Sequence, residues 1–91
     1  MENIIKKLKG MREQVKEELN HIPRGNLNQN MLRQIYWNLR MHSLGKKGTE
    51  KSKEEVLVEA TKLVRKDDPS FHPKFDKSFF KVKKVNYHLL K

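Results

Sequence analysis

Residues 23–45 read PRGNLNQNMLRQIYWNLRMHSLG, a helix breaker followed by an amphipathic helix and a terminal glycine. Pro23 biases the residue before it away from helical backbone, and Gly25 permits a positive φ, so the chain turns here. An asparagine at position 26 or 28 can cap the next helix, which we expect over residues 27–44 with Gly45 as its terminator. The stretch therefore predicts two helices joined by a short turn.

Apolar residues recur at helical spacing on both sides of this stretch. Residues 2–22 carry an apolar stripe with spacings of four and three. Ser52 with Glu55 fits a capping box before a third helix over residues 53–66, and Thr49 is the alternative cap. Acidic and basic residues share the remaining positions of residues 2–22, Glu18 among them, which predicts a solvent-exposed face. The expected core comprises Ile4, Leu8, Met11, Val15, Leu19 and Ile22, then Leu32, Ile35, Tyr36 and Leu39, then Val56, Leu57, Ala60, Leu63 and Val64.

The C-terminal part of the chain follows a different pattern. Residues 71–76 predict an ordered loop whose phenylalanines fold back on the helices. Over residues 79–90, valines and aromatics alternate, which favours a short strand or hairpin, although a helix capped by Ser78 fits almost as well. We therefore expect a single domain over residues 1–91, mainly α, with three helices and a C-terminal extended segment.

The composition limits the class of protein. The chain has 91 residues, a formal net charge of +10 and no cysteine, which excludes disulfides and thiolate zinc sites. No apolar run approaches the ~18 residues that span a bilayer, so we expect a soluble cytoplasmic protein. A domain of this size has a small core and marginal stability, and a homodimer formed through residues 2–22 is one way to bury more apolar surface.

The sequence shows no pattern typical of a catalytic or metal site. The four histidines fall in separate segments. Asp68, His72 and Asp76 could bind a metal together only if residues 68–76 were helical, and Pro69 and Pro73 disfavour a helix there. A chain this short rarely encloses a catalytic cleft. We expect a non-enzymatic protein that needs no cofactor and no metal.

The middle helix differs from its surroundings in side-chain chemistry. Residues 23–48 carry five basic and no acidic side chains. Arg, Asn, Gln and Trp make the bidentate, planar and stacking contacts of recognition surfaces. With the basic turn after this helix and the tail lysines, the predicted recognition residues are Arg24, Asn30, Arg33, Gln34, Trp37, Asn38, Arg40, Met41, Lys46, Lys47, Lys81, Lys83 and Lys84.

Two interpretations use these residues. In the first, the protein is a nucleic-acid-binding regulatory or accessory factor, for DNA rather than RNA, whose arginines and amides read bases while its lysines hold phosphates. In the second, the same helix docks onto an acidic or nucleic-acid-binding protein as an inhibitor or adaptor, with Trp37 as the anchor. The size and charge fit a small protein of a phage or mobile element. A core position for Trp37 is a further alternative.

Overall fold

The computed structural model describes residues 2–44 and 51–82, with side chains from residue 9 onward. This part of the chain is mainly helical and contains no strand, which confirms the predicted fold class. It forms three α-helices and one short 3-10 helix: α1 (Glu2–Leu19), α2 (Leu27–Ser43), α3 (Lys53–Arg65) and η1 (Lys77–Lys81). None of the helices in these two stretches is long and apolar enough to cross a membrane.

The helix starts follow from side-chain caps. The Asn26 side chain accepts a hydrogen bond from the Gln29 backbone N–H at 2.9 Å, and the Ser52 hydroxyl accepts one from the Glu55 N–H at 3.2 Å. Each bond satisfies a backbone donor that the first turn of a helix leaves free. Of the two asparagines that fit the sequence pattern, Asn26 is therefore the cap of α2.

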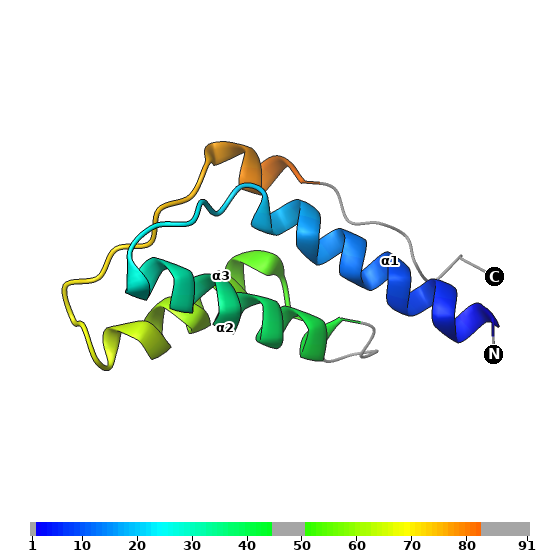
Figure 1. The fold of residues 1–91 in the computed structure, drawn as a ribbon, viewed down its shortest axis with the longest axis horizontal. Helices are drawn as coiled ribbons and strands as arrows, with labels where there is room; N and C mark the ends of the chain where they lie inside the picture. The colour runs from blue at the N-terminus through cyan, green and yellow to red at the C-terminus, as the bar shows by residue number, and fades with distance from the viewer. Residues whose placement is uncertain (1, 45–50, 83–91) are drawn as a thin grey trace.

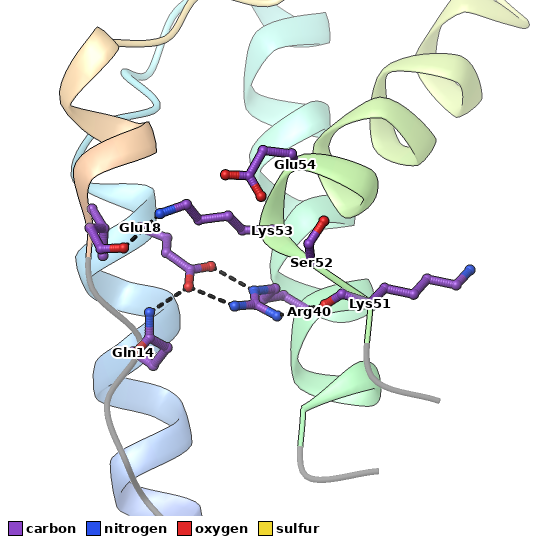
Figure 2. A pocket seen from close by; sticks show the side chains of 8 residues that line it. Gln14, Glu18, Arg40, Lys51, Ser52, Lys53 and Glu54 are labelled. Carbon is purple, nitrogen blue, oxygen red and sulfur yellow. Dashed lines mark hydrogen bonds and ion pairs between the residues drawn. The ribbon is translucent and has the colours of Figure 1, made fainter. Parts of the chain in front are cut away.

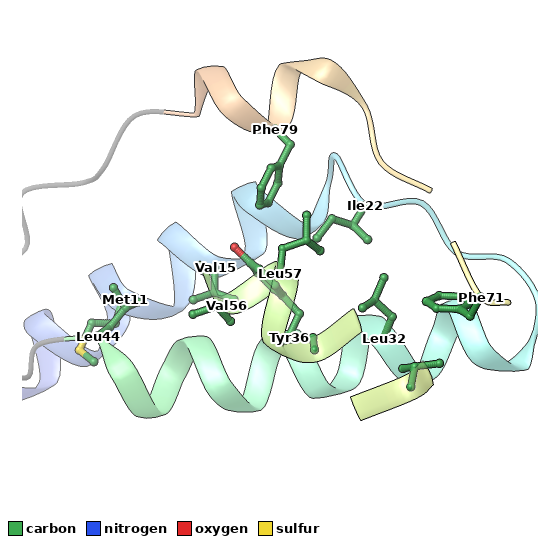
Figure 3. Packing of buried hydrophobic residues seen from close by; sticks show 12 residues of the cluster. Met11, Val15, Ile22, Leu32, Tyr36, Leu44, Val56, Leu57, Phe71 and Phe79 are labelled. Carbon is green, nitrogen blue, oxygen red and sulfur yellow. The ribbon is translucent and has the colours of Figure 1, made fainter. Parts of the chain in front are cut away.

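The middle helix α2 packs against both α1 and α3. The chain after α3, residues 66–82, is called the return segment; it carries η1 and lies over the end of α1 (Figure 1). All three helices and the return segment contribute to one apolar cluster (Figure 3). Phe79 of η1 is fully buried, and its ring meets Tyr36 edge to face at 5.9 Å. The cluster consists of Met11, Val15, Ile22, Leu32, Tyr36, Leu44, Val56, Leu57, Ala60, Val64, Phe71 and Phe79.

A few expected core positions differ. Ile35 and Leu39 are only partly buried, although both pack against the cluster. Leu63 of α3 is exposed. Thr61, which was not expected in the core, is buried, and its hydroxyl donates to the Leu57 carbonyl at 2.8 Å. That bond satisfies the hydroxyl inside the core.

The return segment is tied to the turn between α1 and α2. The Gln29 side-chain amide donates to the carbonyls of Pro23 and Lys74, both at 2.9 Å, and accepts from the Lys74 N–H at 3.0 Å. The Asp76 N–H donates to the His21 carbonyl at 2.7 Å. These bonds hold the segment where Phe71 is buried, as predicted for this loop, whereas Phe75 stays partly exposed.

The predicted strand over residues 79–90 lies mostly outside the described residues. Its first part, residues 79–81, belongs to the 3-10 helix η1. Residues 83–90 are not described.

Candidate functional site

The predicted recognition residues do not form one surface. Arg40 is buried, whereas Arg24 and Lys81 are exposed outside α2. On α2, Asn30, Gln34 and Asn38 are exposed, and Arg33, Trp37 and Met41 are partly buried. Lys46, Lys47, Lys83 and Lys84 lie outside the described residues.

The expectation that Arg40 lies on the exposed side of α2 is wrong, and so is the solvent-exposed position expected for Glu18. Arg40 is 4% exposed and Glu18 is 0% exposed. The Arg40 guanidinium donates from Nε to Glu18 Oε1 at 2.7 Å and from Nη2 to Oε2 at 2.9 Å (Figure 2). Its Nη1 donates to the Lys51 carbonyl at 3.1 Å. A bidentate pair of this kind satisfies both charges inside the protein.

Two neutral groups complete the buried network. Gln14 Nε2 donates to Glu18 Oε2 at 2.6 Å, and the Tyr36 hydroxyl donates to Glu18 Oε1. Burial raises the pKa of Tyr36, and the charge of Glu18 raises it further. Burial alone lowers the pKa of Arg40, but the hydrogen bonds and charge of Glu18 outweigh burial and raise it. The network therefore keeps Tyr36 protonated and Arg40 charged.

A hollow of about 450 Å³ adjoins this network, with Glu18, Arg40, Lys51 and Lys53 among its lining residues. The Glu18 carboxylate already accepts four hydrogen bonds, from Gln14, Tyr36 and twice from Arg40. A carboxylate has about four acceptor positions, so Glu18 has none left to take a proton from a ligand. The network acts to join α1 to α2.

Arg33 has a different role at the boundary of the same two helices. Its Nε donates to the Ile22 carbonyl at 2.7 Å, which ties α2 to the turn that follows α1. Burial lowers the pKa of Arg33, and the nearby charge of Arg24 lowers it further. Arg33 lines two surface hollows, and Leu19 lines both of them as well.

The smaller of these hollows brings four predicted residues together. Its volume is about 240 Å³, and its lining consists of Leu19, Asn30, Arg33, Gln34 and Trp37. The larger, of about 330 Å³, adds both acidic and basic side chains of α1: Glu13, Lys16 and Glu17. The α1–α2 boundary is therefore mixed in charge, and two apolar residues, Leu19 and Trp37, are part of the lining of the smaller hollow.

The solvent side of α2 is almost free of charge. The helix contains no lysine, aspartate or glutamate, and its two arginines are engaged with Ile22 and Glu18. Leu27 is 78% exposed, and Met31 is also exposed. We call this side the α2 outer face: the exposed Leu27, Asn30, Met31, Gln34 and Asn38, bordered by Trp37 and Met41, which are partly buried and also pack against the apolar cluster.

Leu27 and Met31 were not among the predicted recognition residues. Their spacing contains the signal, because Leu27, Met31, Gln34 and Asn38 follow one another at intervals of four, three and four. That spacing places them on one side of a helix, opposite the buried Leu32 and Tyr36.

Comparison with known protein families, with curated proteins and with solved structures finds no match for this chain.

Proposed function

We propose that this protein is a protein-binding module, an inhibitor or adaptor, that docks a partner on the α2 outer face. The observation that supports the proposal is an exposed helix side without charge in a chain that is 35% charged. Cores of protein interfaces are depleted in Lys, Glu and Asp and enriched in Trp and Met. The α2 outer face has this composition, with Trp37, Met31 and Met41.

The partner's chemistry follows from the hollow at the edge of this face. The hollow is lined by two apolar residues, Leu19 and Trp37, and by Arg33. Since only the Nε of Arg33 is bonded to Ile22, its terminal nitrogens suit a carboxylate. We expect the partner to insert an apolar side chain beside an acidic residue.

The inner side of α2 holds this surface in place. The network of Glu18 and Arg40, together with the Arg33 bond to Ile22, fixes α2 against α1. A surface that is rigid before binding loses less conformational entropy when it binds. Arg33 and Arg40 were predicted to contact the partner, but their bonds to Ile22 and Glu18 instead support the docking surface from the inner side of α2.

The test compares two exposed apolar residues on different helices. Leu27→Glu adds a negative charge to the α2 outer face, and Val58→Glu adds the same charge at an exposed position of α3. A glutamate in the first turn of a helix is favourable to the helix dipole, so Leu27→Glu should fold normally. Each variant and the unchanged protein are used to capture proteins from cell lysate of the source organism, with and without nuclease treatment.

We expect one discrete protein to be retained by the unchanged chain and by Val58→Glu, and lost with Leu27→Glu. Retention that disappears after nuclease treatment would contradict the proposal. Equal retention by all three proteins would contradict it as well, because the docking surface would then lie elsewhere.

Duplex DNA is a second candidate partner for α2, and one observation favours it. Asn30, Gln34 and Asn38 are exposed at intervals of four, and such amides pair with adenine edges in a major groove. Arg24 is also exposed and available to a phosphate, whereas Arg40 is not. In this reading Arg24→Ala reduces the slope of log affinity against log salt by about 0.9. Binding to duplex no stronger than that of polylysine of equal charge would count against it.

A further inference from the structure

Two phenylalanine rings at the end of the return segment face solvent. Phe75 is 39% exposed and Phe80 is 51% exposed. The two rings meet edge to face, with centroids 5.5 Å apart, and each also contacts the buried ring of Phe79. Because Phe79 packs on Tyr36 in the core, the two exposed rings are anchored to the core (Figure 3).

The backbone beneath these rings is also fixed. The Asp76 carboxylate caps η1 by accepting from the Ser78 N–H at 3.0 Å, and its own N–H is bonded to the His21 carbonyl at 2.7 Å. The hydrogen bond from Ser78 holds the pKa of Asp76 below its ordinary value, so the cap persists under mildly acidic conditions. The rings are therefore held in position before any ligand arrives.

Three exposed lysines accompany the rings. Lys74 precedes Phe75 in the chain, Lys81 follows Phe80, and Lys77 lies between. Asp76 is the only acidic residue in residues 69–82, and it lies 3.9 Å from the His21 ring. We call the two exposed rings and the three exposed lysines next to them in the sequence the phenylalanine–lysine patch: Lys74, Phe75, Lys77, Phe80 and Lys81.

We propose that the phenylalanine–lysine patch binds single-stranded nucleic acid. Unpaired bases stack on exposed aromatic rings while neighbouring ammonium groups pair with the backbone phosphates, without dependence on base sequence. Each exposed ring here has a lysine next to it in the chain, which matches the alternation of base and phosphate. This site is separate from the α2 outer face, and the inference does not rest on the function proposed for α2.

Other polyanions fit the patch less well. Bases in a duplex are already stacked and paired, so they offer no free face to Phe75 or Phe80. Binding at a membrane surface needs a helix with a broad apolar face. The five-residue η1 exposes one apolar ring, Phe80, between exposed lysines.

The test measures the fluorescence anisotropy of a labelled oligothymidylate of about 12 nucleotides, within the usual site size. Phe80→Leu keeps an apolar side chain but removes the stacking face, and Val58→Ala changes an exposed apolar residue on α3. We expect Phe80→Leu to weaken binding about tenfold and Val58→Ala to leave it unchanged. Phe75→Leu should act like Phe80→Leu, and the circular dichroism of each variant should match the unchanged protein.

Lysine variants supply an independent measurement. Lys77→Gln should reduce the slope of log affinity against log salt by about 0.7, the value for one phosphate contact on a single strand. Lys62→Gln, at an exposed position of α3, should leave the slope unchanged.

Three results would overturn the inference. In the first, both Phe80→Leu and Phe75→Leu bind the oligonucleotide as tightly as Val58→Ala does. In the second, a duplex of the same length binds as tightly as the single strand. In the third, Phe80→Leu abolishes binding to vesicles containing phosphatidylserine but leaves oligonucleotide binding intact.

Discussion

Glu18 and Arg40 form a buried, bidentate ion pair that joins α1 to α2, with nitrogen–oxygen distances of 2.7 and 2.9 Å (Figure 2). Removing two charges from water is unfavourable, and only good geometry with further hydrogen bonds offsets this cost. Gln14 and Tyr36 supply those bonds to Glu18, and the Lys51 carbonyl accepts one from Arg40. The pair thereby fixes which side of α2 faces inward.

Breaking this pair should destabilise the fold strongly. Glu18→Ala leaves the Arg40 charge buried without a partner, and we expect the free energy of unfolding to fall by about 3–5 kcal/mol. In a domain of marginal stability this loss leaves much of the chain unfolded. Urea denaturation followed by circular dichroism measures the change, with Glu17→Ala, at a well-exposed glutamate, as the control.

Replacing both charges should be less harmful than replacing one. We expect Glu18→Leu combined with Arg40→Met to be more stable than either single variant, because neither charge is then left unpaired. Single variants whose destabilisations add up to that of the double variant would show that the two charges do not interact.

Because of Tyr36, we expect the free energy of unfolding to decrease at alkaline pH. Its pKa is raised in the folded protein, so the folded state holds this proton more tightly than the unfolded chain does. The resulting stabilisation is complete below a pH of about 10, the ordinary tyrosine value, and is lost as the pH rises above it. The urea concentration at the midpoint of unfolding should therefore begin to decrease at about pH 10 and decrease further as the pH rises above that value.

Tyr36→Phe separates this effect from the titration of the lysines. At neutral pH the variant should be less stable by about 1–3 kcal/mol, because Glu18 loses one hydrogen-bond donor. Its alkaline loss of stability should be smaller than that of the unchanged protein. An identical pH profile in both proteins would contradict the contribution assigned to Tyr36.

Gln29 predicts a contrast between two glutamines of the same helix. Gln29 is buried and bonds to Pro23 and Lys74, whereas Gln34 is exposed. Gln29→Ala leaves backbone groups of the return segment unpaired, so we expect it to lower the free energy of unfolding by about 1–3 kcal/mol. Gln34→Ala should stay within about 0.5 kcal/mol. Thermal unfolding of the two variants that gives equal midpoints would contradict the role of Gln29.

The sequence was sufficient to place the helices because local signals agree there. The side chains of Asn26 and Ser52 cap α2 and α3 as their residue types favour, and Pro23 lies in the turn before α2. Periodicity identified most of the core, including Val15, Tyr36 and Val64, since one apolar side must be buried. These features depend on residues close together in the chain.

The buried network was missed because its two charges are far apart in sequence. Glu18 resembles its neighbours Glu13 and Glu17 in type, and only its position distinguishes it. Gln14 and Glu18 fall among Met11, Val15 and Ile22 at intervals of three and four, which places them on the buried side of α1. Arg40 likewise follows Leu32 and Tyr36 at intervals of four. Glu18 and Arg40 are buried with the apolar stripes of their helices although both are charged, because each has the other as a partner on the neighbouring helix.

The candidate site was only partly predictable for the same reason. The absence of lysine and acid over residues 23–45 directed the site prediction to α2, yet two of the arginines that were expected to form the recognition surface are engaged in packing. Which of two polar sides a central helix buries depends on what the neighbouring helix offers. Arg40 is buried because Glu18 on α1 provides a carboxylate that pairs with its charge.

The most direct measurement of the central claim is the dissociation constant of the partner captured from nuclease-treated lysate, determined by isothermal titration calorimetry with purified proteins. Met31→Glu and Leu27→Glu alter the α2 outer face, and Val58→Glu adds the same charge on α3. If α2 is the docking surface, both α2 variants should weaken binding by at least about tenfold, or ~1.4 kcal/mol, while Val58→Glu binds like the unchanged protein. Equal dissociation constants for all four proteins would contradict the claim.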